Sequence, residues 1–301
     1  MTNHMTHPLH NPDRIPAVLE EIIEFKREQV AAEQAAEPIG VLHAQALDTP
    51  PPRDFFAAVT EHRVMKAGHP DIAVIAEIKR RSPSAGLIRP EYESDDFDPS
   101  VIAQAYSNAG ASAISCLTDQ KFFGGNPDYI AKIKQTIDLP VLRKDFIIDP
   151  YQIIQARAIQ ADAVLLIAEC LTNAQIAAFI EQITELDMTT LLEVHSKANL
   201  DRVLPILESA PDKRILLGIN NRDLSTMTTD LNNSIKLKPS VPKDIHLVTE
   251  SGIKTRQDLQ TLSDAGLKIA LIGEHLMRTP NPGAALAQML SSEQTSPPAA
   301  Q

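Results

Sequence analysis

The chain has 301 residues, of which 43% are hydrophobic and 22% are charged, a composition typical of a globular protein with a sizeable core. Its 28 Lys and Arg residues stand against 39 Asp and Glu residues, which gives a formal net charge of −11. This acidic balance argues against a nucleic-acid binder and against docking on anionic membranes, because both need a basic surface. Small anionic substrates are not excluded, because they respond to the local field of a cleft.

The sequence shows no sign of a membrane span, a signal peptide or a disulfide framework. Its longest apolar run, residues 163–168, is far shorter than the ~20 residues that cross a bilayer, and the N-terminus lacks the apolar segment of a signal peptide. The two cysteines, Cys116 and Cys170, form neither a CxxC pair nor a zinc-ligand spacing. We therefore expect a cytoplasmic protein with two structural thiols.

Two helical segments precede the first convincing strand. Apolar residues recur at helical spacing over residues 15–34, and residues 53–64 form a second short helix after a run of three prolines. Residues 1–65 are therefore predicted to be a helical extension packed on a domain that spans residues 66–290. The polar tail, residues 291–301, is expected to be disordered.

Farther along the chain, short β-branched or Leu-rich runs alternate with amphipathic helical segments, as in βα units around a parallel sheet. The eight predicted strands are residues 72–79, 112–118, 140–146, 162–169, 188–195, 214–221, 245–251 and 267–273. Helices are expected at residues 99–108, 127–136, 150–159, 173–186, 197–209, 255–264 and 282–290. This pattern predicts an α/β fold, a (β/α)8 TIM barrel with an N-terminal helical extension. The alternative, a doubly wound open sheet, would normally show a Gly-rich turn after its first strand, and GxGxxG is missing.

Polar residues lie at the carboxyl ends of several predicted strands, which is where the active sites of (β/α)8 barrels are found. Because strand side chains alternate, one register directs a set of them from five strands into a common mouth. The set consists of Glu77, Lys79, Lys144, Glu193, Asn220, Arg222 and Glu250. Any one of them is compatible with a solvated strand end, whereas chance convergence of all of them is much harder to obtain.

Lysines and carboxylates in one cleft form a proton-handling set. Desolvation or a nearby cation would lower the pKa of Lys79 or Lys144, whereas a neighbouring carboxylate such as Glu77 would keep the lysine charged. The sequence does not decide between these outcomes. Schiff-base catalysis by either lysine is a second possibility.

Two glycines at strand ends indicate a phosphate site. Gly252 follows the seventh predicted strand and Gly273 ends the eighth, where barrels commonly bind phosphate through backbone N–H groups. Turn formation alone would also explain either glycine.

The same strand ends and loops resemble a known family. The motifs that carry the resemblance are IAEIKRRSPSAGLI from Ile75, LTDQKFFGG from Leu117, PVLRKDFIIDPYQI from Pro140, QADAVLLIAE from Gln160, LLEVH from Leu191, GINNRDL from Gly218, TESGI from Thr249 and LIGEHLMRTP from Leu271. Together they resemble indole-3-glycerol phosphate synthase of tryptophan biosynthesis over nearly the whole chain.

The resemblance implies a (β/α)8 barrel and a carboxy-lyase activity. The reaction it implies converts 1-(2-carboxyphenylamino)-1-deoxyribulose 5-phosphate into indole-3-glycerol phosphate, CO2 and water. It implies no organic cofactor and no metal. The expected partner is a small-molecule phosphorylated substrate, with no nucleic acid and no membrane, and the protein is expected to be a monomer or weak homodimer.

Roles for individual residues also follow from the resemblance. Lys144 matches the family's general acid on the carbonyl oxygen, Glu193 matches its general base, and Lys79 matches a residue that contacts the substrate carboxylate and is a second candidate proton donor. The other catalytic matches are Glu77, Asn220 and Glu250. Substrate-binding matches are Ser82, Phe123, Phe146, Arg222, Leu224 and Ser251, of which Phe123, Phe146 and Leu224 would contact the aromatic ring. Phosphate-binding matches are Ser82, Gly252, Gly273 and Glu274, the last standing where some members have Ser.

Two other functions compete with this interpretation. Another phosphate-binding barrel isomerase would lack EIKRRSPS, and an inactive barrel acting as a partner-binding subunit would be expected to have lost Lys79, Lys144 or Glu193. All three are present. Finally, basic residues near the strand ends predict a locally positive mouth on this acidic protein. They are Lys79, Arg80, Arg81, Lys121, Arg143, Lys144 and Arg222.

Overall fold

Eight parallel strands form a closed barrel in the computed structural model, which describes residues 17–61, 70–94, 97–210, 214–223 and 226–291. The strands are β1 (Ala73–Ile78), β4 (Ala113–Leu117), β5 (Val141–Lys144), β6 (Ala163–Ile167), β7 (Thr189–Val194), β8 (Ile215–Asn220), β9 (His246–Glu250) and β10 (Ile269–Ile272). Their order around the barrel is β1-β10-β9-β8-β7-β6-β5-β4, so that each strand pairs with its sequence neighbours and β1 closes the ring against β10. The predicted (β/α)8 barrel is confirmed, and each predicted run contains one of the strands.

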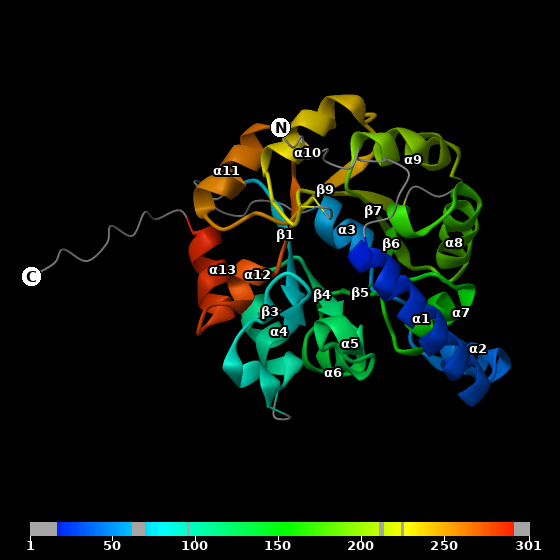
Figure 1. Cartoon of the computed structure of the whole chain (residues 1–301). Helices are drawn as coiled ribbons and strands as arrows, with labels where there is room; N and C mark the ends of the chain where they lie inside the picture. The colour runs from blue at the N-terminus through cyan, green and yellow to red at the C-terminus, as the bar shows by residue number, and fades with distance from the viewer. Residues whose placement is uncertain (1–16, 62–69, 95–96, 211–213, 224–225, 292–301) are drawn as a thin grey trace, which may run out of the picture.

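Helices follow the strands and surround them (Figure 1). The longer ones are α4 (Pro99–Asn108), α6 (Asp128–Thr136), α7 (Pro150–Ala158), α8 (Asn173–Glu185), α9 (Lys197–Ser209), α11 (Arg256–Asp264) and α13 (Pro282–Leu290). Shorter elements are the hairpin β2 (Arg81–Ser82) and β3 (Gly86–Leu87), η1 (Pro90–Glu93), α5 (Gln120–Phe123), η2 (Ala168–Cys170), α10 (Asn232–Leu237), η3 (Lys238–Ser240) and α12 (Glu274–Met277). Most of the longer helices begin at a side-chain cap; for example, Thr172 and Thr255 each form a reciprocal capping box.

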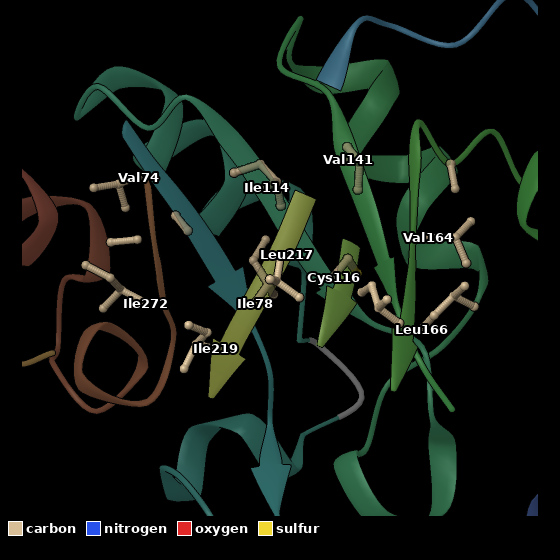
Figure 2. Packing of buried hydrophobic residues seen from close by; sticks show 14 of the residues in the cluster. Val74, Ile78, Ile114, Cys116, Val141, Val164, Leu166, Leu217, Ile219 and Ile272 are labelled. Atoms are coloured by element: carbon tan, nitrogen blue, oxygen red, sulfur yellow. The ribbon is translucent and has the colours of Figure 1, made fainter. Parts of the chain in front are cut away.

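The strands are buried on both faces, because one face packs against the helices and the other fills the barrel. Figure 2 shows the outward layer, which includes Val74, Ile114 and Val141. The inward layer includes Ile75, Leu142 and Leu191. Because side chains alternate along a strand, the residue two positions after each inward apolar residue also points into the barrel axis. Those positions are Glu77, Lys144 and Glu193.

Three helices precede the barrel: α1 (Ala17–Ala36), α2 (Ile39–Asp48) and α3 (Phe55–Thr60). The predicted helices over residues 15–34 and 53–64 correspond to α1 and α3, although residues 15, 16 and 62–64 lie outside the described part of the chain. The α2 helix was not predicted. It buries only Leu42 and Ala46 of its own residues, in a cluster with Tyr151 and Ile154 of α7, so tertiary packing rather than a strong helical pattern holds it. Figure 1 shows α1 and α2 beside α7.

The two ends of the chain lie mostly outside the described residues. This applies to residues 1–16 of the predicted extension and to residues 292–301 of the predicted tail. Within the described ranges, no helix is long and apolar enough to span a membrane.

Candidate active site

A cavity of about 600 Å³ opens at the carboxyl ends of the barrel strands. Every predicted site residue that the structure describes lines it. These are Glu77, Lys79, Ser82, Phe123, Lys144, Phe146, Glu193, Asn220, Arg222, Glu250, Ser251, Gly252, Gly273 and Glu274. Leu224, predicted to contact the aromatic ring, lies outside the described residues. The shared inward register of the barrel strands brings the strand-end members together, the segments that follow the strands supply the others, and the roles of all of them remain predictions.

Lys144, the last residue of β5, occupies the centre of the site. Its Nζ atom lies 3.0 Å from Oε2 of Glu193 and 2.8 Å from Oε2 of Glu250. Burial alone would lower the pKa of Lys144, but the surrounding carboxylates outweigh burial and raise it. Lys144 is therefore an ammonium ion at neutral pH. A Schiff base at this position is disfavoured, because it requires the neutral amine.

Glu193 and Glu250 are ionised differently although they flank the same lysine. Burial acts to raise the pKa of Glu193, but Lys144 and His195 outweigh it and hold that pKa well below its usual range. Burial and the neighbouring Glu193 raise the pKa of Glu250 to about 8. At neutral pH Glu193 is thus a carboxylate and Glu250 is mostly protonated. Two carboxyl groups whose pKa values are driven apart are a common basis for separate acid and base roles.

Asn220, at the end of β8, orients Glu193 from a third direction. Its Nδ2 atom donates to Oε1 of Glu193 at 3.1 Å, while the Asn220 side-chain oxygen accepts from the backbone N–H of Arg222 at 3.0 Å. The second of these bonds fixes the amide so that its nitrogen faces Glu193.

Glu77 and Lys79, at the end of β1, form an ion pair with 2.6 Å between Lys79 Nζ and Glu77 Oε1. The carboxylate of Glu77 lies directly over Gly273. A Cβ atom at that glycine would stand 2.2 Å from Glu77 Oε1 and 2.9 Å from Glu77 Cβ. Gly273, predicted to serve the phosphate site, therefore also makes room for Glu77.

The backbone after β9 has an unusual conformation at the predicted phosphate end. Ser251 and Gly252 adopt φ values of 68° and 84°, both in the left-handed region. For Ser251 this costs about 1–2 kcal/mol, and non-glycine residues in this region cluster at functional sites. Asn221 holds the turn, because its Nδ2 atom donates to the carbonyl oxygen of Ser251 at 3.0 Å.

Glu274 places a carboxylate, rather than a hydroxyl, at this end of the cavity. It pairs with Arg222 at 3.1 Å and with Arg278 at 3.0 Å. Burial acts to raise its pKa, but Arg278, Lys79 and Arg222 outweigh burial and lower it. An ionised Glu274 repels a phosphate dianion, so its side chain is suited to holding the arginines and not to binding the anion itself.

An apolar wall faces the charged groups. The rings of Phe123 and Phe146 lie with their centroids 6.0 Å apart, and Leu165 and Ile167 of β6 extend the wall. Helix α1 completes it with its N-terminal residues Val18, Leu19 and Ile22. This contribution could not be predicted from the sequence, because helical periodicity shows that α1 has an apolar face but not which end of the barrel that face covers.

A buried lysine of α1 forms ion pairs with two residues beside the cavity. Lys26 is 1% exposed, and its Nζ atom lies 2.9 Å from Asp119 Oδ2 and 2.9 Å from Asp145 Oδ1. Asp145 directly follows Lys144, and the side chain of Asp119 caps α5, which ends at Phe123. Lys26 therefore connects α1 to loops that carry a charged and an apolar member of the site.

Most of the basic residues from which a positive mouth was predicted do not line the cavity. Of the seven basic residues, only Lys79, Lys144 and Arg222 line the cavity. The others point elsewhere: Arg143 is on the outward face of β5, where it donates to the Gln152 carbonyl at 2.9 Å, and Lys121 lies 4.0 Å from the Phe25 ring centroid. Alternation along the strand separates Arg143 from Lys144.

The cavity is in fact lined by charges of both signs. Its further basic side chains are Lys254, Arg278, His195 and His275, and its acidic side chains are Glu77, Asp145, Glu193, Glu250 and Glu274. Among the described residues, no group of three or more His, Cys, Asp or Glu side chains is arranged to hold a metal ion.

His195 also lines the cavity and was not included in the predicted set. It stands two residues after Glu193, so the same alternation that selected Glu193 also places His195 on the inward face. Its Nε2 atom lies 3.1 Å from Glu193 Oε1, and its Nδ1 atom lies 3.1 Å from Glu169 Oε2.

These features define a class of protein: a (β/α)8 barrel with a buried cluster of paired lysine and glutamate side chains at the carboxyl ends of its strands. The solved structures that it resembles agree with this fold. The 3-hexulose-6-phosphate synthase of Salmonella typhimurium superposes with a TM-score of 0.56 at 14% sequence identity, covering 73% of this chain and 98% of that one. At such low identity the likeness concerns the fold alone.

Sequence comparison identifies the family. The family model for indole-3-glycerol phosphate synthase matches residues 19–289, from α1 to α13. The indole-3-glycerol phosphate synthase of Rhodopirellula baltica is 45% identical over 275 residues, 91% of this chain and 99% of that relative. That of Acidithiobacillus ferrooxidans is 44% identical over 272 residues, 90% of this chain and 98% of the relative. The chain therefore belongs to the indole-3-glycerol phosphate synthase family. This confirms the resemblance carried by the motifs and the predicted carboxy-lyase of tryptophan biosynthesis.

Proposed function

We propose that the cavity closes the indole ring of 1-(2-carboxyphenylamino)-1-deoxyribulose 5-phosphate, with Lys144 as general acid and Glu193 as general base. The observation that carries this proposal is the position of Lys144 Nζ between Glu193 and Glu250, at 3.0 and 2.8 Å. This contact provides a charged proton donor and an ionised base within one hydrogen bond of each other.

The substrate has three parts that need different surroundings, and the cavity offers each of them. The aromatic ring packs against Phe123 and Phe146, and its carboxylate meets Lys79. The phosphate lies near the backbone of Gly252 and Gly273. A cavity of about 600 Å³ suits a ligand of this size. Holding both ends of the flexible chain brings the ring close to the carbonyl carbon, which makes confinement an important part of catalysis.

Ring closure needs an electrophilic carbonyl. The ring carbon that bears the carboxylate attacks the carbonyl carbon, and the carbonyl oxygen receives a proton from Lys144 as the new C–C bond forms. The raised pKa of Lys144 supports this assignment, because it keeps the donor charged before reaction. Loss of CO2 then restores the aromatic ring.

Dehydration completes the product and needs an acid and a base together. The hydroxyl group leaves as water with a proton from a lysine, and Glu193 takes the proton from the neighbouring carbon. Glu250, with a pKa of about 8, is mostly protonated at neutral pH, and its Oε2 atom lies 2.8 Å from Lys144 Nζ, so this carboxyl group can return a proton to the lysine after the transfer. Which of Lys144 and Lys79 donates in the dehydration is decided by comparing their Met variants.

Further parts of the proposal concern the whole chain. Residues 1–65 form an extension on the barrel of residues 66–290, followed by the tail of residues 291–301, and the protein acts in the cytoplasm without nucleic acid or membrane. We propose a monomer or weak homodimer, because the described large apolar side chains that are exposed are few, and three of them lie on the single short helix α2.

The activity is tested by adding the phosphorylated substrate and following the fluorescence of the indole product. Product formation that is lost in Glu193→Gln supports the proposal. A folded wild-type protein that forms no product contradicts it and favours an inactive barrel. For Lys79→Met, we expect weaker substrate binding, and a Lys79→Met variant with unchanged binding and unchanged chemistry would remove Lys79 from the site.

A further inference from the structure

His195 forms the centre of a chain of contacts behind the proposed base. The ring lies between two carboxylates, with Nδ1 at 3.1 Å from Glu169 Oε2 and Nε2 at 3.1 Å from Glu193 Oε1. The contact with Glu169 is a hydrogen bond, whereas the contact with Glu193 is an ion-pair contact that is not aligned as a hydrogen bond. At 3.1 Å, the charge of the ring acts directly on the Glu193 carboxylate.

Glu169 fixes the histidine from the side away from Glu193. It lies in η2, directly after β6, and its Oε1 atom accepts from the backbone N–H of His195 at 2.9 Å. The same oxygen accepts from Asn199 Nδ2 at 2.9 Å, which ties Glu169 to α9. Each carboxylate oxygen of Glu169 thus has a fixed donor, and the imidazole is oriented by both its backbone and its ring.

The protonation state of the imidazole follows from this arrangement. Both ring nitrogens face carboxylate oxygens, and an ionised carboxylate only accepts hydrogen bonds. Burial acts to lower the pKa of His195, but Glu169 and Glu193 outweigh it and raise that pKa to about 10. His195 is therefore an imidazolium at neutral pH, buried beside the group proposed to be the base.

We infer that His195 is a positioning residue for Glu193, held by Glu169, and that its positive charge keeps Glu193 ionised and directed at the substrate. This inference rests on the proposed role of Glu193 as general base. The Oε2 atom of Glu193 meets Lys144, and its Oε1 atom meets His195 and Asn220. When Lys144 gives up its proton, His195 is the cation that still faces Glu193 in this arrangement.

Other charged groups surround the pair and set the size of the expected effect. Lys144 of β5 lowers the pKa of Glu193, and the buried Glu250 of β9, which also contacts Lys144, lowers it further through a hydrogen bond. Because Lys144 remains when His195 is replaced, removing the imidazolium shifts the titration of Glu193 without neutralising it. An opposite charge at this distance is worth about one pKa unit or more.

The test compares His195→Gln with the wild type across the acidic pH range, with the chemical step measured in single-turnover experiments at saturating enzyme and KM measured separately in the steady state. We expect the acidic limb of the pH–rate profile to shift to higher pH by about one unit or more, while KM at alkaline pH stays almost unchanged. His246→Gln is a matched control, because His246 is exposed at the start of β9, at the other end of the barrel. It should leave the pH profile unchanged.

Glu169→Gln tests whether Glu169 acts through the histidine. It should shift the acid limb in the same direction, and adding it to His195→Gln should produce no further change. The imidazole itself is observed by nitrogen NMR, with the His195 signal assigned from its absence in His195→Gln. The ring should remain doubly protonated at about pH 8 in the wild type and lose its proton at lower pH in Glu169→Gln.

Each outcome decides between named explanations. An unshifted acid limb in a folded His195→Gln protein contradicts the inference, as does a rise in KM with an unchanged pH profile, which would make His195 a substrate contact. If Glu193→Gln keeps the full single-turnover rate, the proposed base is wrong instead. A neutral His195 ring at neutral pH would overturn the inference without affecting the role of Glu193.

Discussion

Replacing Lys26 by Met should destabilise the protein more than almost any other change to a charged residue. The variant keeps the apolar length of the side chain but removes the cation between Asp119 and Asp145, whose side chains are 0% and 2% exposed. Removing one partner of a buried ion pair costs about 3–5 kcal/mol, because it leaves a charge buried without compensation. Asp145 retains its contacts with Thr118 and Arg143, so most of the cost falls on Asp119.

The loss should depend on pH in a particular direction. Burial acts to raise the pKa of Asp145, but Lys26 and Arg143 outweigh it and hold that pKa below its usual range. A depressed folded-state pKa contributes stability that is present above the unfolded pKa and is lost as the pH falls through the folded value. Without Lys26, this contribution shrinks, so the wild type and the variant should differ most near neutrality and least in acid.

Urea unfolding followed by circular dichroism measures the effect, since the chain has no tryptophan for fluorescence. Arg27→Met is the matched control: Arg27 is the next residue of α1, it is exposed, and its pair with Glu24 is a surface one, so the change should stay within about 0.5 kcal/mol. If Lys26→Met lowers the free energy of unfolding equally at about pH 4 and at about pH 7, the electrostatic reasoning is refuted and the effect is due to packing.

Three further changes test separate parts of the site. Gly273→Ala places a Cβ atom 2.2 Å from Glu77 Oε1, so we expect the Glu77 carboxylate to be displaced and kcat to fall about tenfold or more, while the circular dichroism spectrum stays unchanged. An unaffected kcat would show that the position of Glu77 is unimportant. Glu274→Gln removes an anion that pairs with Arg222, so inorganic phosphate should inhibit the variant more strongly than the wild type, and weaker inhibition would contradict the repulsion described above. Burial and Glu193 raise the pKa of Glu250 to about 8, so the stabilising contribution of protonated Glu250 is fully present below the unfolded-state pKa and is lost as the pH rises through the folded-state pKa. Glu250→Gln should therefore gain stability relative to the wild type between about pH 5 and about pH 9. A difference in unfolding free energy that stays constant over this range would contradict the titration of Glu250.

Much of the barrel could be predicted from the sequence because its strands are short apolar runs between turns. The run at β6 is buried throughout, as is expected for a parallel strand covered on both faces. Alternation then specified the inward register, so Lys144 could be placed in the mouth from the position of Leu142. The same rule, applied fully, would have excluded Arg143 and included His195.

Contacts between distant segments could not be predicted in this way. Lys26 is one charged residue on an amphipathic helix, and only the folded chain places it 2.9 Å from Asp119 and Asp145. Helix α2 is another case, since its position depends on packing against α7 and not on its own pattern. Pairing also determines charge states: the sequence left the pKa of Lys144 undecided, and its two flanking carboxylates raise it.

The single-turnover rate of the Lys144→Met variant tests the central claim most directly. Enzyme is used in saturating excess over substrate, substrate binding is measured separately, and indole product is followed by fluorescence. If Lys144 is the general acid, the chemical step should slow by about 10²- to 10⁴-fold while the substrate still binds. A rate close to that of the wild type, or a loss confined to binding, would contradict the proposed acid–base mechanism.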